Sequence, residues 1–193
     1  MDATRRVYIA WNRLVTDENL SAEERYTCRR DVFTNLPDMD WQAFGALGSA
    51  DAISTSEAFM SWLAKQDSYS DSEILRIQQG CTARGLDGAY SESYDEILWN
   101  ALFSDPVTYA KMLADPDAMD SETKWYAILG AAFYGELFPE QEQAAAEALD
   151  DVIGTNILTV EENDWAKLLR YYLANPNDGF YGDYPKTPAE LTD

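Results

Sequence analysis

Four carboxylates lie close together in the stretch DPDAMDSE, at Asp115, Asp117, Asp120 and Glu122. Clustered oxygen ligands of this kind can bind Ca²⁺. The EF-hand pattern fails here, because its fifth, sixth and twelfth positions hold Met119, Asp120 and Tyr126. We therefore expect the start of a helix, capped by Asp120 or Ser121, and we expect no metal or other cofactor.

Paired carboxylates can hydrolyse glycosides without any histidine. The chain has 6 Trp and 12 Tyr that could stack on sugars. Its acid pairs are neighbours in sequence, and neighbours on a helix point about 100° apart, so such a pair rarely faces one substrate. A small glycoside hydrolase without histidine therefore stays an alternative. The pairs are Asp95/Glu96, Asp150/Asp151 and Glu161/Glu162.

Other catalytic chemistries find no support in the residues. The chain has no His, which excludes Ser-His-Asp and Cys-His catalysis. Cys28 and Cys81 match no zinc spacing and are either two buried thiols or one disulfide. Gly85 and Gly88 in RGLDG form no phosphate loop. The expectation is a protein that is not an enzyme.

Charge is the strongest signal in the sequence. Lys and Arg number 14 and Asp and Glu number 35, which gives a formal charge of -21. Residues 1–35 hold six of each sign, so the whole excess lies in residues 36–193. Residues 112–166 hold 13 acids and a single basic residue, Lys124. Such a surface repels nucleic acid and anionic lipid, so neither is an expected partner.

The charge predicts a non-enzymatic protein that binds a basic protein surface. Carboxylates three or four residues apart on a helix are ~5 to 6 Å from one another, close to a phosphate step. By composition the chain resembles DNA-mimic inhibitors, including anti-CRISPR and anti-restriction proteins, so a nucleic-acid-binding enzyme is the expected kind of partner. The candidate partner-binding residues are Asp115, Asp117, Asp120, Glu122, Glu136, Glu140, Glu147, Asp150, Asp151, Glu161 and Glu162.

Helix signals dominate the chain and predict an all-α fold. Apolar residues recur at spacings of three and four, and no segment alternates long enough to predict a strand. We expect one compact domain over residues 1–174, with nine or ten short helices arranged as a bundle or an irregular stack of helix pairs. Within it, residues 1–35 are neutral and residues 36–174 polyanionic. Residues 175–193 are expected to be an irregular tail packed on this body.

Capping boxes predict five of the helix starts. They are Ser21/Glu24, Ser54/Glu57, Ser70/Glu73, Ser93/Glu96 and Thr159/Glu162. Asp105-Pro106 and Pro139 predict two further starts, since proline suits the first helical position. Gly80, Gly135 and Gly154 are predicted to lie just past the ends of helices.

Aromatic residues are expected mainly in the core. Five tryptophans lie at apolar positions of their helices: Trp11, Trp62, Trp99, Trp125 and Trp165. The tail carries Phe180, Tyr181 and Tyr184, which predict packing against the body or, alternatively, a contact with a partner.

The segment Leu86–Leu113 resembles HEAT-like helix pairs in bacterial secreted proteins. It covers one seventh of the chain and holds no diagnostic motif. The resemblance implies a helical-repeat interaction module of an exported protein, which is the second alternative. The expected location is the cytoplasm, or outside the cell if the natural protein loses a leader segment.

Overall fold

The computed structural model describes residues 1–48, 52–86, 88–178 and 185–191. It is all-α, with 72% of residues in helix and no strand in the described ranges. The fold class predicted from the helix signals is confirmed. The helices are α1 (Ala3–Thr16), α2 (Ala22–Asn35), η1 (Leu36–Asp38), α3 (Trp41–Gly45), α4 (Ala52–Ala64), α5 (Asp71–Gly80), α6 (Ala89–Ser104), α7 (Pro106–Ala114), α8 (Ser121–Gly135), α9 (Pro139–Asp150), α10 (Val160–Ala174) and η3 (Pro188–Glu190).

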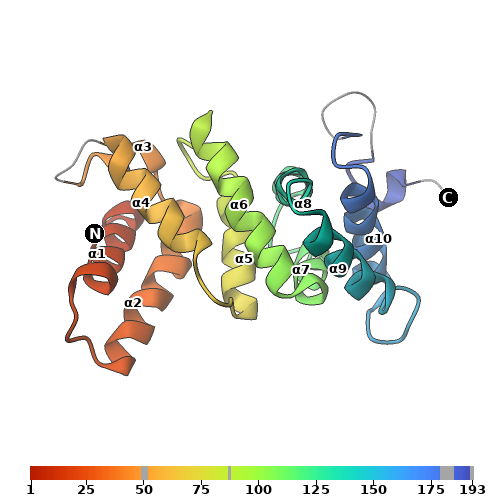
Figure 1. Ribbon diagram of the computed structural model, residues 1–193, viewed down its shortest axis with the longest axis horizontal. Helices are drawn as coiled ribbons and strands as arrows, with labels where there is room; N and C mark the ends of the chain where they lie inside the picture. The colour runs from red at the N-terminus through yellow and green to blue at the C-terminus, as the bar shows by residue number, and fades with distance from the viewer. Residues whose placement is uncertain (49–51, 87, 179–184, 192–193) are drawn as a thin grey trace.

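The helices follow one another along the long axis of the molecule as a stack of helix pairs (Figure 1). One layer runs through α4, α6 and α8, each in contact with the next. The other runs through α2, α5, α7 and α10. The segment that resembles a HEAT-like pair corresponds to α6 and α7, which pack on each other.

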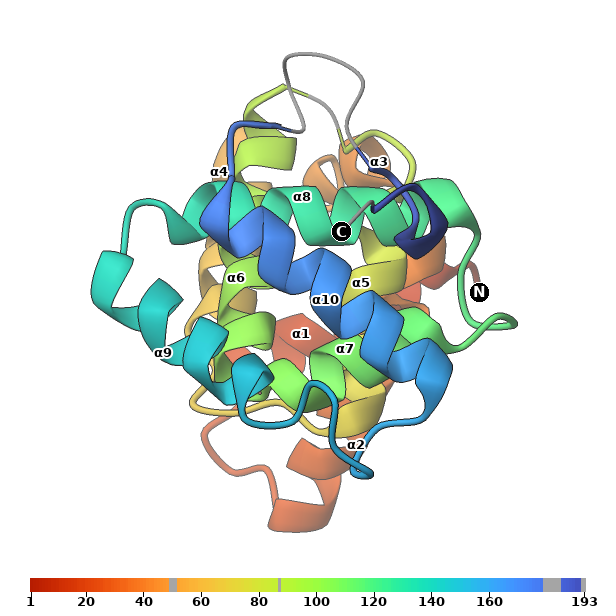
Figure 2. The same ribbon diagram turned by 90° about the vertical axis from the view of Figure 1, so that its right-hand side faces the viewer.

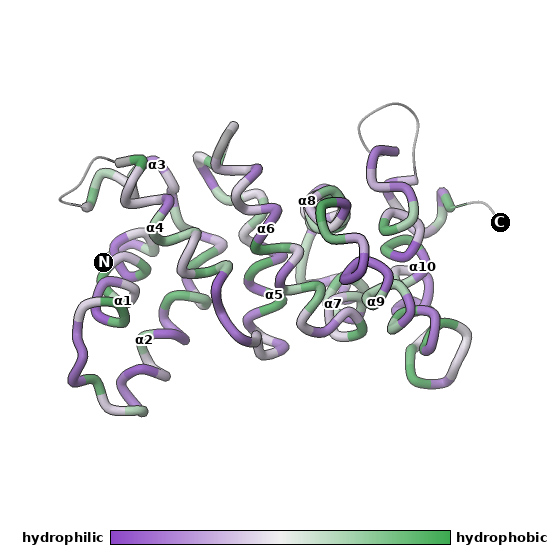
Figure 3. The backbone as a smooth tube through the Cα atoms, viewed as in Figure 1, coloured by the Kyte–Doolittle hydropathy of each residue, from purple (hydrophilic) through white to green (hydrophobic). Residues whose placement is uncertain are grey.

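One hydrophobic core runs the length of this stack. Each helix alternates between hydrophobic and hydrophilic residues, as expected for helices with one face in the core (Figure 3). Trp11, Trp99 and Trp165 are buried, whereas Trp62 and Trp125 are half-buried and pack against the core. Trp41, which the apolar pattern did not single out, is fully buried.

Glycines let α6 pack closely against α5 and α8. A Cβ at Gly80 of α5 would lie 2.3 Å from the Tyr94 hydroxyl, and one at Gly135 of α8 would lie 2.6 Å from the Trp99 ring. The prediction that these glycines follow helix ends was wrong, because each is the last residue of its helix and has no positive φ. Gly154 does have a positive φ of 78°, in the turn after α9.

Most of the predicted helix starts are confirmed. Capping boxes at Ser21, Ser70 and Thr159 open α2, α5 and α10. Asp105 and Asp120 cap α7 and α8 by accepting hydrogen bonds from the backbone N–H groups of Thr108 and Thr123. Pro139 opens α9.

Two predicted starts were wrong. Ser54 and Ser93 lie inside α4 and α6, which begin at Ala52 and Ala89. The Ser-x-x-Glu spacing also fits a helix interior, so the motif alone does not fix a start.

The two cysteines are free thiols. Cys28 is buried and Cys81 half-buried, and neither forms a disulfide.

The described end of the chain contacts α8 and α10. The Tyr172 hydroxyl donates to the Pro185 carbonyl at 2.8 Å, and the Lys186 ammonium lies 4.7 Å from the centre of the Trp125 ring. The tail aromatics Phe180, Tyr181 and Tyr184 lie outside the described residues.

Candidate functional site

The predicted partner-binding carboxylates are almost all at the surface. Ten of the eleven are exposed and Glu162 is half-buried. They belong to the end of the stack formed by α7 to α10. Figure 2 looks onto this end, where α10 crosses the view and α9 lies beside it. The structure therefore places the predicted residues at one end of the molecule, though not all on one helix.

The first group of acids lies on α9. Ala145, Ala146 and Leu149 bury one side of this helix. Its exposed side carries acids, and we call this set the α9 face: Glu140, Glu147, Asp150 and Asp151. Glu136, another candidate partner-binding residue, is not on this helix but caps the end of α8. It accepts a hydrogen bond from the Asn177 amide at 3.3 Å.

A second group lines a shallow hollow between the end of α7 and the start of α10. We call it the α7–α10 hollow; its volume is about 320 Å³. Asp115, Glu161 and Glu162 supply its carboxylates, and Lys111 supplies a positive charge. Asp115 and Glu161 are far apart in sequence and are brought together here only by packing.

The single basic residue of residues 112–166 is withdrawn from the surface. Lys124 is only 5% exposed, and its ammonium lies 5.0 Å from the centre of the Trp165 ring. Burial lowers the pKa of Lys124, while the charges of Glu161 and Asp115 oppose that shift. The exposed surface of this segment therefore carries carboxylates with no cation of its own among the described residues.

Several of these acids also stabilise the fold locally. Asp120 and Glu162 take part in helix caps, and Asp115 accepts from the Asp117 backbone N–H at 3.0 Å. Asp150 forms an ion pair with Arg170 of α10 at 3.1 Å. Substitution of these residues would change stability as well as any binding.

Apolar side chains are exposed among the acids. Leu137 and Phe138 stand between α8 and α9 and are 68% and 40% exposed, and Val160 at the start of α10 is 81% exposed. Exposed apolar residues within a polar surface are the usual contact points of protein interfaces.

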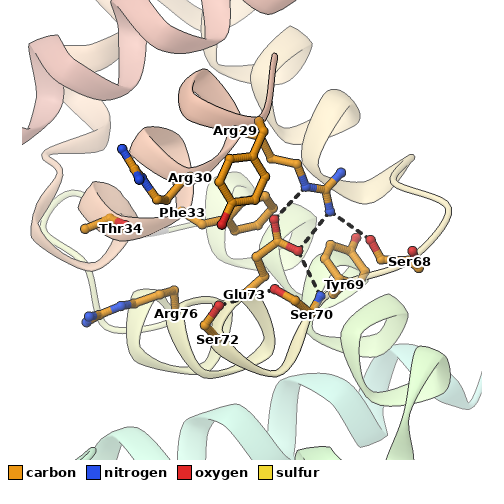
Figure 4. Close-up of a pocket in the computed structure, with 11 residues that line it drawn as sticks. Arg29, Arg30, Phe33, Thr34, Ser68, Tyr69, Ser70, Ser72, Glu73 and Arg76 are labelled. Carbon is orange, nitrogen blue, oxygen red and sulfur yellow. Dashed lines mark hydrogen bonds and ion pairs between the residues drawn. The ribbon is translucent and has the colours of Figure 1, made fainter. Parts of the chain in front are cut away.

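A basic pocket, which sequence reasoning missed, lies between α2 and α5 (Figure 4). Its volume is about 600 Å³. It is lined by Tyr26, Arg29, Arg30, Phe33, Thr34, Ser68, Tyr69, Ser70, Ser72, Glu73 and Arg76. The excess of arginine in residues 1–35 was a signal for it, but only packing brings Arg76 to the same place.

Arg29 joins α2 to α5 and to the residues before α5 on one side of this pocket. Its guanidinium bonds both carboxylate oxygens of Glu73, at 2.5 and 3.0 Å, and it also donates to the Gln66 side chain and to the Ser68 carbonyl. Burial raises the pKa of Glu73, but hydrogen bonds from Arg29 and the Ser70 backbone outweigh it and leave the pKa lowered. The two charges neutralise each other.

A small cavity of about 170 Å³ between α6 and α8 is lined by a half-buried acid, Asp95. Burial, with a smaller effect of the Glu92 charge, raises the pKa of Asp95 to about 7. Tyr94 and Tyr126 also line this cavity. Among the described residues that line the cavity, Asp95 is the one carboxylate.

No group of three or more His, Cys, Asp or Glu side chains within the described ranges could hold a metal ion. None of the helices described is long and apolar enough to cross a membrane. Comparisons with models of known families, with curated proteins and with solved structures find no match for this chain.

Proposed function

We propose that this protein is a non-enzymatic binding protein whose acidic end, formed by α7 to α10, engages a basic surface of a partner protein. The expected partner is a nucleic-acid-binding enzyme whose basic cleft the carboxylates occupy in place of phosphates, as in anti-CRISPR or anti-restriction inhibitors. The observation that carries the proposal is the burial of Lys124 beneath exposed carboxylates. Because the segment's one cation is withdrawn, its exposed charges are carboxylates, and Lys111 and Arg170 beside the segment offset only part of the negative field.

The regular helix that carries the α9 face also supports binding through the acidic end. The α9 face holds Glu140, Glu147 and Asp150 on one regular helix that packs on α7, α8 and α10. Carboxylates held in place need little further ordering when a partner binds, so less conformational entropy is lost.

A specific observation also favours the helical-repeat alternative. The paired helices form two layers that extend along one axis, as repeat proteins do (Figure 1). An interaction module of this kind would also be a binding protein. It would differ from the proposal above because its partner would contact surfaces along the stack instead of the acidic end.

The glycoside hydrolase alternative has weaker support. Asp95 has the raised pKa of a general acid and lies in a cavity with two tyrosines. Glycosidases need a second carboxylate ~5 to 9.5 Å from the first. Glu92 influences the pKa of Asp95 but does not line its cavity.

The test is capture of partners from the native source at low salt, followed by titration of the purified partner. Duplex DNA should compete with the protein for that partner. Affinity should fall steeply as salt rises, because exposed charges are screened. Reversal of the α9 face, with Glu140, Glu147, Asp150 and Asp151 changed to Lys, should abolish binding while far-UV circular dichroism stays unchanged.

A matched control changes the net charge equally at exposed acids of the other part of the molecule. These are Glu18, Asp38, Glu57 and Asp67, each changed to Lys. The control should retain most of its affinity. Binding that is insensitive to salt, or lost equally in both variants, would contradict the proposal.

A further inference from the structure

The pocket between α2 and α5 is basic in a protein of formal charge -21. Three arginines and one carboxylate, Glu73, stand among its lining residues. Since Arg29 and Glu73 form a bidentate pair, they cancel in the charge balance. Arg30 and Arg76 are left to set the charge of the pocket.

Neither of these two arginines has a strong ionic partner in the part of the chain that the structure describes. Arg30 lies 3.9 Å from Asp31, its neighbour in sequence, and both side chains are more than half exposed. An exposed contact of this kind contributes little. Arg76 donates to the neutral side chain of Gln79 at 2.8 Å. Figure 4 shows both arginines on the side of the pocket away from the Arg29 guanidinium, with their guanidinium groups directed outward, so both side chains must turn inward to meet one phosphate.

We propose that this pocket binds an organic phosphate monoester, with Arg30 and Arg76 contacting the phosphate. Two guanidinium groups suit a dianion with three acceptor oxygens, whereas one would satisfy a carboxylate. The hydroxyls of Thr34 and Ser72 line the same pocket and add donors. The inference is independent of the acidic end.

The size and the apolar lining of the pocket indicate a ligand larger than phosphate itself. A volume of about 600 Å³ falls within the range of small-molecule sites. Tyr26 is 66% exposed and supplies an aromatic wall that a ligand can reach, whereas Phe33 and Tyr69 are buried beneath the pocket. The organic group would pack on the Tyr26 ring.

Calorimetric titration with phenyl phosphate at low ionic strength and neutral pH tests the proposal. Phenyl phosphate should bind more tightly than inorganic phosphate, which lacks the ring, and more tightly than benzoate, which has a single charge. Equal binding of phenyl phosphate and inorganic phosphate would overturn the organic part of the proposal. No saturable binding of phenyl phosphate at roughly 10 mM would overturn it altogether.

Variants locate the site. Arg30→Gln with Arg76→Gln should weaken phenyl phosphate binding by roughly tenfold or more, the effect expected when charge-assisted hydrogen bonds are lost. Arg5→Gln with Arg84→Gln makes the same charge change at exposed arginines outside the pocket and should leave affinity unchanged. An equal loss in both variants would overturn the assignment. If the double variant unfolds, Arg30→Gln alone, at an exposed side chain, gives the same readout.

Discussion

The Asp95 carboxylate of α6 lies against the bare backbone of Gly130 in α8. A Cβ at position 130 would stand 2.2 Å from Asp95 Oδ1, so the carboxylate fills the space that any side chain there would need. This contact leaves the carboxyl group half-buried between two of the most closely packed helices of the stack. The raised pKa of Asp95, about 7, is the physical result.

Asp95 should make the folded protein less stable as pH rises. Its ordinary pKa is 3.8, so the folded state holds a proton between about pH 4 and pH 7 that the unfolded state has lost. Asp95→Asn should therefore raise the free energy of unfolding. This increase should be larger at about pH 8 than at about pH 5, by on the order of 2 kcal/mol. Urea unfolding at both pH values measures it.

Asp67→Asn is the matched control, because Asp67 is exposed. Its effect on the free energy of unfolding should be within ~0.5 kcal/mol, as for other surface substitutions. A gain from Asp95→Asn that does not change with pH would show that the folded-state pKa is not raised.

Gly130→Ala should destabilise the protein, although alanine favours a helix interior by ~1 kcal/mol over glycine. The new methyl group would clash with Asp95 and also meet the Leu98 side chain at 2.8 Å. We expect a loss of ~1 to 3 kcal/mol in the free energy of unfolding, the usual cost of overpacking. The same substitution in an Asp95→Ala background should cost clearly less. An equal cost in both backgrounds would place the clash elsewhere.

Local features of the fold were predictable from the sequence, and contacts between distant residues were not. Ser21, Ser70 and Thr159 cap helices because the motif acts within one turn. The failures at Ser54 and Ser93 have a local cause too, since Ser-x-x-Glu is tolerated inside a helix. The burial of Trp41 among the rings of Phe44, Phe59 and Tyr94 depends on tertiary packing, which no periodicity encodes.

In the candidate sites, too, local properties were predictable from the sequence and contacts between distant residues were not. Exposure of the acids follows from their charge, so the sequence predicts it. The meeting of Asp115 with Glu161, the burial of Lys124 over Trp165 and the pairing of Arg29 with Glu73 all join residues at least 40 positions apart. A single sequence carries no signal for such pairs.

The Arg29–Glu73 pair should couple α2 to α5 energetically. The two side chains are 29% and 13% exposed, so screening by water is weaker than at the surface. A double-mutant cycle with Arg29→Met and Glu73→Gln should give a coupling of ~1 to 3 kcal/mol in the free energy of unfolding. The exposed pair of Arg13 and Glu24, 3.5 Å apart, is the control and should give ~0 to 1 kcal/mol. Similar couplings for both pairs would show that burial adds nothing here.

Leu137 should act as an apolar anchor for the partner of the acidic end, if the α9 face is the surface that binds. It is 68% exposed and directly precedes Phe138 and the start of α9, beside the carboxylates of that helix. Leu137→Ser should weaken partner binding by roughly tenfold, the loss expected from one buried apolar contact of ~1.4 kcal/mol. Stability should change by less than ~0.5 kcal/mol, as for other surface substitutions. Val160→Ser alters a residue that is 81% exposed at the α10 start, between Thr159 and Glu161 of the α7–α10 hollow, and should weaken binding less than Leu137→Ser does. If Val160→Ser weakens binding and Leu137→Ser does not, the partner contacts the region of the α7–α10 hollow instead of the α9 face.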